Sequence, residues 1–281
     1  MLRVFNRGLR LHSVWRGEPA AGSPPPLLLL HGLFGSSSNF RSPGLQLAKD
    51  GRRPVLLADL RNHGNSPWSD DCSLESMAED VVDTLDAMGL EQVTICGHSL
   101  GGKVAMAAAL KAPHRFTGLI VVDIAPVSYG SSHPGWSTNT SIMDAMAAIP
   151  PSALGSRADA DRALEAAGVG AGAPGVRAFL MQNLVPDERR WKFNLHALRA
   201  AAANDVYAGF PSQLPPAPAS LAVRVISGTE SWYALTAEHR VALQHWFPGA
   251  EPETCWIEGA GHWVHAERPA EFVALVDEFA P

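Results

Sequence analysis

The sequence predicts an α/β fold in which helices cover one mainly parallel sheet. Short runs of β-forming apolar residues alternate with segments of helical periodicity from about residue 27 to residue 125, and this alternation resumes after residue 220. The chain has 281 residues, of which 46% are hydrophobic, so it can bury a sizeable core. One globular domain is therefore the expected organisation.

The individual elements follow from this alternation. Strands are predicted at residues 27–30, 54–59, 92–96, 118–123, 222–227 and 253–257. The clearest helix begins after Ser73, a suitable N-cap, and ends at Gly89. Further helices are predicted at residues 100–111, 236–246 and 270–279. Alternating residues near the start also predict a pair of strands joined around residues 6–8.

The region from 126 to 220 breaks the alternation of strands and helices. It contains alanine-rich helical stretches, many prolines and glycines, and no convincing strand. We interpret it as a helical cap inserted into a core formed by residues 1–125 and 221–281. Its glycine- and proline-rich stretches could instead be linkers, but the strands that follow complete the earlier sheet.

Composition excludes several classes of partner and site. A net charge of −6 without a Lys/Arg run leaves no basic surface for nucleic acid. Cys72, Cys96 and Cys255 are too few and too scattered for a disulfide framework or a zinc site, which favours a reducing compartment. No apolar run approaches the roughly 20 residues of a transmembrane helix. We expect a soluble intracellular protein in the cytoplasm; the arginine-rich start leaves a mitochondrial location open.

A serine between a strand and a helix is the strongest chemical signal. Ser99 lies in Gly-His-Ser-Leu-Gly, residues 97–101, directly after a predicted strand. Small residues two positions before and after the serine allow a tight, strained turn that exposes the hydroxyl, an arrangement called the nucleophile elbow. The helix that follows directs its positive end toward negative charge developing near the serine. The alternative is a chance match to a short motif, which the strand and helix on either side make improbable.

A serine nucleophile needs a base, and a glycine-rich loop near the C-terminus provides one. His262 lies after the last predicted strand and before the last helix. His265 is the competing residue, and we expect it to form a loop or helix-start hydrogen bond instead. A metal site at this histidine pair is not favoured, because no third ligand cluster accompanies it.

The segment LLLLHGLFGSSSNF, residues 27–40, changes abruptly from an apolar strand to small polar residues. Such a turn directs backbone N–H groups outward, where they can stabilise an oxyanion. We expect the donors to be the backbone N–H groups of Leu33 and of Leu100, the residue after the nucleophile. The alternative is an ordinary strand-to-helix turn.

Five segments together resemble the α/β-hydrolase superfamily. They are HGLFGSSSNF, DLRNHGNSP, GHSLGGKVAM, VVDIAPV and GAGHWVHAERP. Lys103 and the Asp-Ile-Ala-Pro sequence at 123–126 are similar to the branch that contains the YbfF-type esterases and the relatives of abhydrolase-domain-containing protein 11. This resemblance covers essentially the whole chain and is weakest in the cap. It implies hydrolysis of carboxylic esters or thioesters without a cofactor.

The acid of the triad departs from the common pattern of the superfamily. Most members carry it after the strand that follows the cap, where this chain has Ser231 with Glu230 beside it. The YbfF-type esterases are similar in having a serine there and the acid at the end of the preceding strand, which corresponds to Asp123. We therefore expect Asp123 within roughly 3.2 Å of His262 Nδ1, with Ser231 as a supporting donor. Glu230 is the alternative acid, and either carboxylate could instead cap a turn.

Apolar and aromatic side chains are expected around the substrate. The candidates are Phe34, His98, Phe179, Trp191, Trp232 and Trp263. Core packing alone would explain each of them. Because the expected triad and oxyanion residues all lie outside the cap segment around residues 143–184, we predict that this segment controls acyl-chain preference more than the chemistry on very small esters.

Other polar residues are expected to have structural roles. We expect Lys103 to anchor a neighbouring loop. The remaining members of this group should brace the loop after their own strand: Asp59, Arg61, Asn62 and His63.

The sequence thus predicts a serine carboxylesterase or thioesterase that acts on a small-molecule substrate through Ser99, His262 and Asp123. Two alternatives remain: a ligand-binding or regulatory protein with this fold and little turnover, and a carbon–carbon bond hydrolase or perhydrolase. The oligomeric state is left open.

Overall fold

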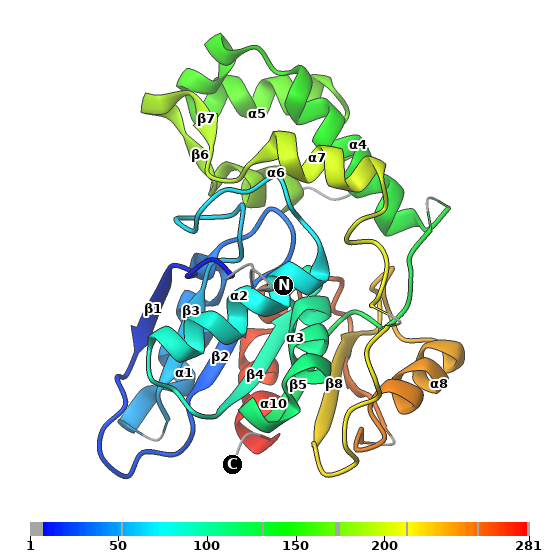
Figure 1. Cartoon of the computed structure of the whole chain (residues 1–281). Coiled ribbons are helices and arrows are strands. Elements are labelled where there is room, and N and C mark those ends of the chain that lie inside the picture. The colour runs from blue at the N-terminus through cyan, green and yellow to red at the C-terminus, as the bar shows by residue number, and fades with distance from the viewer. Residues whose placement is uncertain are drawn as a thin grey trace, which may run out of the picture.

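A seven-stranded sheet forms the centre of the protein (Figure 1). The computed structural model describes residues 8–51, 53–130, 132–171, 175–211, 213–251 and 253–279. The strand order is β1-β3-β2-β4-β5-β8-β9, and every neighbouring pair is parallel except β1 with β3. The predicted α/β fold with a mainly parallel sheet is therefore confirmed.

The strands match the predicted ones with shifts of a few residues at their ends. They are β1 (Ser13–Arg16), β2 (Leu27–Leu30), β3 (Val55–Ala58), β4 (Val93–His98), β5 (Phe116–Val122), β8 (Val223–Gly228) and β9 (Cys255–Ile257). Of the strand pair predicted around residues 6–8, the first strand falls on residues 1–7, which lie outside the described residues, and the second overlaps β1. The first described strand, β1, pairs antiparallel with β3.

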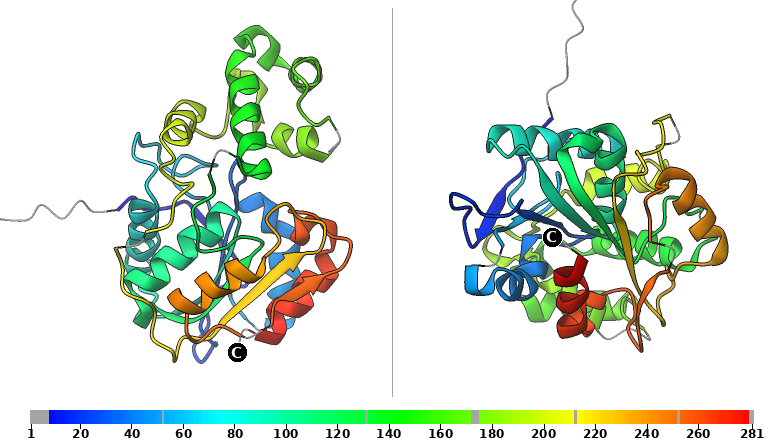
Figure 2. Two further views of the ribbon diagram at one scale, coloured as in Figure 1. Left: turned by 90° about the vertical axis from the view of Figure 1, so that its right-hand side faces the viewer. Right: turned by 90° about the horizontal axis from the view of Figure 1, so that it is seen from below.

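Helices cover both faces of the sheet, as the view from below shows (Figure 2). They are α1 (Arg41–Leu47), α2 (Leu74–Ala87), α3 (Leu100–Lys111), α8 (Ala237–Trp246), α9 (Val264–Glu267) and α10 (Pro269–Phe279). Within β2, Leu28 and Leu30 join the core cluster on the α2–α3 side, whereas Leu27 and Leu29 join the cluster on the α1–α10 side. A strand buried on both faces reads as a continuous apolar run, which explains the four leucines.

Between β5 and β8 the chain leaves the sheet and forms a helical segment above its carboxyl ends (Figure 1). This segment, residues 126–220, is called the cap below. Its elements are α4 (Pro134–Ala148), α5 (Arg157–Ala166), α6 (Gly175–Met181), β6 (Leu184–Val185), β7 (Arg190–Trp191) and α7 (Leu195–Ala203). The expectation that this region contains no strand is wrong in one detail, because β6 and β7 pair as a short antiparallel hairpin.

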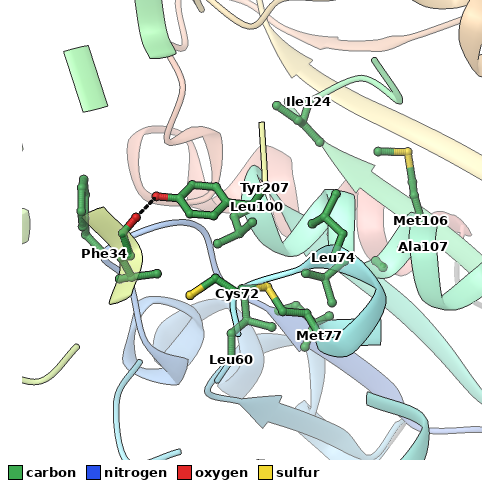
Figure 3. Close-up of a cluster of buried hydrophobic side chains, with 14 of the residues drawn as sticks. Phe34, Leu60, Cys72, Leu74, Met77, Leu100, Met106, Ala107, Ile124 and Tyr207 are labelled. Atoms are coloured by element: carbon green, nitrogen blue, oxygen red, sulfur yellow. Dashed lines mark hydrogen bonds between the residues drawn. The ribbon is translucent and has the colours of Figure 1, made fainter. Parts of the chain in front are cut away.

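The cap shares a hydrophobic core with the sheet. One cluster of buried residues runs from Leu28 of β2 through α2 and α3 to Leu180 and Tyr207 of the cap. Figure 3 shows part of it, with Phe34 and Tyr207 near Leu100. The Tyr207 hydroxyl donates to the Leu198 carbonyl at 2.8 Å, which satisfies its polar end. The cap is therefore packed onto the core and is not a loosely attached lid.

Lys103 joins the cap to the core by hydrogen bonds. Its ammonium group, on the buried α3, donates to the carbonyls of Val127 at 3.0 Å and Gly209 at 2.8 Å, and also to that of Ala208. These carbonyls belong to the two segments by which the chain enters and leaves the cap. The structure thus shows the loop-anchoring contact predicted for Lys103.

Within the described ranges, no helix is both long and apolar enough to cross a membrane. All three cysteines, Cys72, Cys96 and Cys255, are free thiols.

Candidate active site

Ser99 occupies a strained turn between β4 and α3. Its φ and ψ angles are 53° and −118°, in the region that non-glycine residues rarely adopt. A Cβ on Gly97 would lie 2.1 Å from the Gly101 carbonyl oxygen, and a Cβ on Gly101 would lie 2.5 Å from the carbonyl oxygens of Leu30 and His31. Neither contact is sterically possible. The two glycines of the motif are therefore required for β4, α3 and the end of β2 to approach one another.

Asp123 follows β5 directly and is fully buried. Its carboxylate accepts hydrogen bonds from Ser227 Oγ at 2.5 Å, from the Gly228 N–H at 3.2 Å and from Ser231 Oγ. A buried carboxylate with several donors is held in one orientation, and its negative charge is compensated. The remaining partner of Asp123 is His262.

His262 Nδ1 lies 2.6 Å from Asp123 Oδ2. Because a carboxylate only accepts, Nδ1 carries the proton and donates it to Asp123, which leaves Nε2 unprotonated in the neutral ring. Ser99 and His262 line the same pocket. The geometry expected from the sequence, with Asp123 on Nδ1 and Ser231 supporting the carboxylate, is the geometry observed.

The backbone around His262 is held by side chains on both sides. Glu267 accepts from the Gly261 N–H at 2.7 Å and from the Trp263 N–H at 3.3 Å. His98 Nε2 donates to the His262 carbonyl at 2.8 Å. These three hydrogen bonds fix the peptide between His262 and Trp263 and the peptide between Ala260 and Gly261, so the backbone is held on both sides of His262.

Glu230, the alternative acid, lines the same pocket, but the bond to His262 Nδ1 is made by Asp123. Its backbone N–H donates to the Ala260 carbonyl at 2.9 Å, which ties its turn to the loop before His262.

The peptide between Gly32 and Leu33 is held from its carbonyl side. The Gly32 oxygen accepts from the Gly35 N–H at 3.0 Å and from His31 Nδ1 at 2.8 Å. His31 donates through Nδ1 because its Nε2 accepts from the Leu60 N–H at 3.0 Å, and burial lowers the pKa of His31, which keeps the ring neutral. In a trans peptide the N–H points opposite to the C=O. The Leu33 N–H therefore has a fixed direction.

The Leu100 N–H is the second expected oxyanion donor. It stands at the first position of α3, where helical N–H groups have no partner within the helix. Neither it nor the Leu33 N–H donates to another group in the part of the chain that the structure describes. Both N–H groups are thus available to a ligand.

A pocket of about 450 Å³ opens beside Ser99. Most of the residues predicted around the substrate line it: Phe34, His98, Phe179, Trp232 and Trp263. Trp191 is an exception. Its side chain is buried and stacks on Phe193 with ring centroids 5.9 Å apart, so the hydrophobic core of the cap holds it away from the pocket.

His265 differs from its expected role. Its Nδ1 is buried without a hydrogen-bond partner among the described residues, and the ring packs against Phe40 and His98 at centroid distances of 4.6 Å. Burial lowers the pKa of His265 to about 3, so the ring is neutral. The expected hydrogen bond is not formed by Nδ1 with any described residue, because the short helix α9 turns this buried side chain inward.

The bracing role expected for the loop after β3 is observed. Asp59 accepts from the backbone N–H groups of Ser37 at 2.6 Å and Asn65 at 2.9 Å. Arg61 pairs with the buried Asp80 through Nε at 2.6 Å. These contacts link the loop after β3 to α2 and to the loop after β2. The loop after β2, residues 31–37, is called the oxyanion loop below because it carries the expected donor Leu33.

Three polar residues of the site were not predicted from the sequence: Ser227, Glu267 and Asn183. Ser227 and Glu267 act through partners far away in the sequence or through backbone groups, which no local motif marks. Asn183 belongs to the cap and donates to the Phe34 carbonyl of the oxyanion loop. Over the described ranges, no group of three or more histidine, cysteine or acidic residues is arranged to hold a metal ion.

Comparison with known proteins identifies the family. The family described as alpha/beta hydrolase fold matches residues 25–269 of the chain. The chain belongs to the α/β-hydrolase fold family.

Two relatives come from the branch suggested by the sequence motifs. The Mus musculus protein named sn-1-specific diacylglycerol lipase ABHD11 is 38% identical over 262 residues, which cover 91% of this α/β-hydrolase and 80% of that protein. The Escherichia coli protein named esterase YbfF is 35% identical over 248 residues, which cover 87% and 88% of the two chains.

A solved structure is similar over the full length of this α/β-hydrolase. The structure described as a marine microorganism esterase superposes with a TM-score of 0.86 at 34% identity, and the match covers 97% of this chain and 100% of that one. The resemblance inferred from the sequence is confirmed, and the relatives support enzymatic activity of the esterase or lipase type.

Proposed function

We propose that this protein is a serine carboxylesterase or thioesterase that hydrolyses small to medium acyl esters through Ser99, His262 and Asp123. One observation carries the proposal: the bond of 2.6 Å between His262 Nδ1 and a fully buried Asp123, in the pocket that the strained Ser99 turn faces. The relatives named esterase and lipase support the same chemistry.

The proposed reaction has two acyl-transfer steps. His262 Nε2 removes the proton of Ser99 Oγ as the oxygen attacks the carbonyl carbon, and the resulting imidazolium keeps its Nδ1–H on Asp123. The negative charge on the carbonyl oxygen is accepted by the N–H groups of Leu33 and Leu100. His262 then gives its proton to the leaving alcohol or thiol. Water, activated in turn by His262, hydrolyses the acyl-enzyme and frees Ser99.

The pocket supports an uncharged acyl group. Among the described residues that line it there is no lysine or arginine, whereas Glu230 and Glu267 contribute carboxylates. An anionic substrate would meet these carboxylates without a compensating cation. Apolar side chains such as Ile142, Val176 and Leu180, all from the cap, suit a hydrocarbon chain.

We also propose that residues 1–125 and 221–281 form the catalytic core and that residues 126–220 act as its cap. The triad and oxyanion residues come from the core, and the acyl-facing side chains come largely from the cap. This division assigns chemistry to one part of the chain and substrate choice mainly to the other.

Labelling with a fluorophosphonate tests the proposed function. We expect Ser99 to be the modified serine in a mass-spectrometric map, and we expect Ser99→Ala to abolish both labelling and hydrolysis of p-nitrophenyl butyrate. Labelling that survives Ser99→Ala would contradict the assignment. Labelling of Ser99 without turnover of any ester in a chain-length series would favour a ligand-binding protein with this fold.

A further inference from the structure

A buried asparagine of the cap contacts the oxyanion loop. Asn183 lies between α6 and β6 and is only 1% exposed. Its Nδ2 donates to the Phe34 carbonyl at 2.7 Å, a contact between residues 149 positions apart in the chain. The oxyanion loop is thus hydrogen-bonded to the part of the protein that lies over it.

The accepting residue has an unfavourable backbone conformation. Phe34 has a φ angle of 60°, in the left-handed region that suits glycine. Such a conformation costs about 1 kcal/mol or more and persists only where surrounding contacts impose it. The hydrogen bond from Asn183 is one of these contacts. It holds the Phe34 carbonyl, which this backbone conformation directs toward the cap.

Two consecutive hydrogen bonds connect this contact to the proposed oxyanion donor. The Phe34 carbonyl and the Gly35 N–H belong to one rigid peptide group, and that N–H donates to the Gly32 carbonyl at 3.0 Å. The Gly32 carbonyl and the Leu33 N–H belong to another peptide group. Rotation of the first peptide therefore weakens one of the two hydrogen bonds that orient the second, the other being that from His31 Nδ1, and so affects the direction of the Leu33 N–H.

Asn183 is itself held rigidly. Its backbone N–H donates to the Leu180 carbonyl at 3.0 Å, and its carbonyl accepts from the Lys192 N–H at 2.7 Å. Its Oδ1 is buried without a hydrogen-bond partner among the described residues. An unpartnered buried oxygen destabilises the fold, so the stability of the cap does not explain an amide at this position. The donor Nδ2 is the group that the site uses.

We propose that Asn183 is a positioning residue for the oxyanion hole, by which the cap orients the Leu33 N–H. This inference rests on the proposed function. It also adds to the expectation that the cap affects acyl-chain preference more than the chemistry on very small esters: through Asn183 the cap contributes to that chemistry as well.

The test compares Asn183→Leu, which keeps the approximate size and removes the donor, with the wild type on p-nitrophenyl acetate. Rates are divided by the concentration of active sites, which is titrated with a fluorophosphonate. A smaller fraction of folded protein in the variant therefore does not lower its kcat. We expect kcat to fall about 10- to 100-fold. This loss should not exceed the effect of removing an oxyanion-hole donor itself, because Asn183 acts only through the position of such a donor. The KM should change less than about threefold. The affinity for a trifluoromethyl ketone, whose adduct carries the oxyanion, should fall by a similar factor.

A second variant covers the case in which Asn183→Leu does not fold. Asn183→Asp keeps the shape, and its carboxylate repels the Phe34 carbonyl when ionised. When protonated, the acid can donate to that carbonyl, and burial raises the pKa of such a carboxyl. We therefore expect the ratio of its kcat to that of the wild type to rise as the pH falls.

The matched control is Asn194→Asp. Asn194 also joins the cap to the core, since its Nδ2 donates to Asn62 Oδ1 at 3.2 Å, but among the described residues it forms no hydrogen bond with the oxyanion loop. The aspartate keeps the oxygen that caps α7 by accepting from the Ala197 N–H. We expect its kcat on p-nitrophenyl acetate within about twofold of the wild type, because one peripheral hydrogen bond contributes little to the barrier.

The outcomes separate this inference from the proposed function. Turnover that is the same in the wild type and in Ser99→Ala would overturn both. Ser99-dependent turnover with unchanged kcat in the Asn183 variants, a change in KM alone, or unchanged affinity for the trifluoromethyl ketone would overturn only the role of Asn183. An equal loss of kcat in Asn194→Asp would also overturn it, because the effect would then be a general loosening of the cap.

Discussion

At the scale of single residues, the site depends on strained backbone positions. Ser99, Asp123 and Phe34 all have φ angles between 53° and 60°, although none is glycine. Each lies where the chain leaves a strand or turns at the carboxyl edge of the sheet, and each directs a side chain or a peptide group toward the pocket. Strain of about 1–3 kcal/mol at such positions is stable only because the surrounding structure imposes it.

The role of Asp123 can be measured by Asp123→Asn. The amide cannot accept the Nδ1 proton in the same way as the carboxylate, and it does not stabilise the imidazolium. We expect kcat to fall by a factor on the order of 10³ to 10⁴ with a modest change in KM. Steady-state kinetics on p-nitrophenyl butyrate, with sites titrated by fluorophosphonate, provide the measurement.

Glu230→Gln is the control for that substitution. Because Glu230 lines the pocket but is not the carboxylate bound to His262, its loss should lower kcat less than tenfold. A larger loss of kcat in Glu230→Gln than in Asp123→Asn would identify Glu230, in the loop after the cap, as the acid of the triad.

At the scale of elements, close contact between β2, β4 and α3 builds the nucleophile turn. The glycines of the elbow face backbone atoms and not side chains, so no rotamer change can make room for a larger residue. The cap is joined to this framework through a shared core and through Lys103. Deleting the cap would expose that core, so point substitutions are the better test of its function.

Gly101→Ala tests the contact between α3 and β2. The added Cβ would lie 2.5 Å from two backbone oxygens, which forces α3 away from the sheet. We expect a loss of at least about 1–3 kcal/mol in the free energy of unfolding, together with loss of activity, because the elbow moves with the helix. Urea unfolding and turnover of p-nitrophenyl acetate check both effects.

Gly175→Ala is the matched control for that substitution. Gly175 begins α6, and no atom of the described residues lies within 4 Å of a Cβ at this position. Its replacement should leave stability unchanged or slightly raised, because alanine lowers the entropy of the unfolded chain. A similar loss of stability in both variants would mean that the elbow contact is not the cause.

Phe179 of α6 tests how the cap selects substrates. Its ring lies against Trp263 with centroids 5.8 Å apart, and both residues line the pocket. We expect Phe179→Ala to enlarge the acyl site and shift the optimum of kcat/KM toward longer p-nitrophenyl esters, while the kcat on the acetate stays within about threefold of the wild type. An equal loss across the whole chain-length series would show that this side chain does not set the preference.

At the scale of the whole molecule, several histidines are buried in the core. Burial lowers the pKa of His63 and of His265 to about 3, and lowers those of His31 and His98. The fold therefore holds these rings neutral, whereas the unfolded chain protonates them below about pH 6.5. Their burial links stability to pH.

We expect stability to be lost as the pH falls from about 6.5 toward 3. In this window the unfolded state binds more protons than the folded state, so the free energy of unfolding decreases with falling pH, by at most about 1.4 kcal/mol per pH unit for each buried histidine. Urea unfolding at pH 7.5, 5.5 and 4.5 measures the slope. His265→Leu should reduce it, whereas His114→Leu, at an exposed position, should leave it unchanged. Equal slopes in the wild type and in His265→Leu would contradict this assignment.

Local sequence determined the elements of the sheet and the nucleophile turn. The four leucines of β2 indicate a strand buried on both faces. Only glycine fits at positions 97 and 101, because a Cβ there would collide with backbone atoms of the same turn or of the end of β2. The pairing of Asp123 with His262 was expected from family resemblance, since nothing local relates two residues 139 positions apart.

Only the tertiary structure decided which groups hold the residues of the proposed triad and oxyanion hole in place. The contacts of Asn183 with Phe34 and of His98 with the His262 carbonyl join residues 149 and 164 positions apart, and the stacking of Trp191 on Phe193 withdraws that ring from the pocket. A short motif specifies a turn because its atoms interact with one another. Contacts across the chain depend on how the sheet order and the cap bring distant segments together, and that is a property of the fold as a whole.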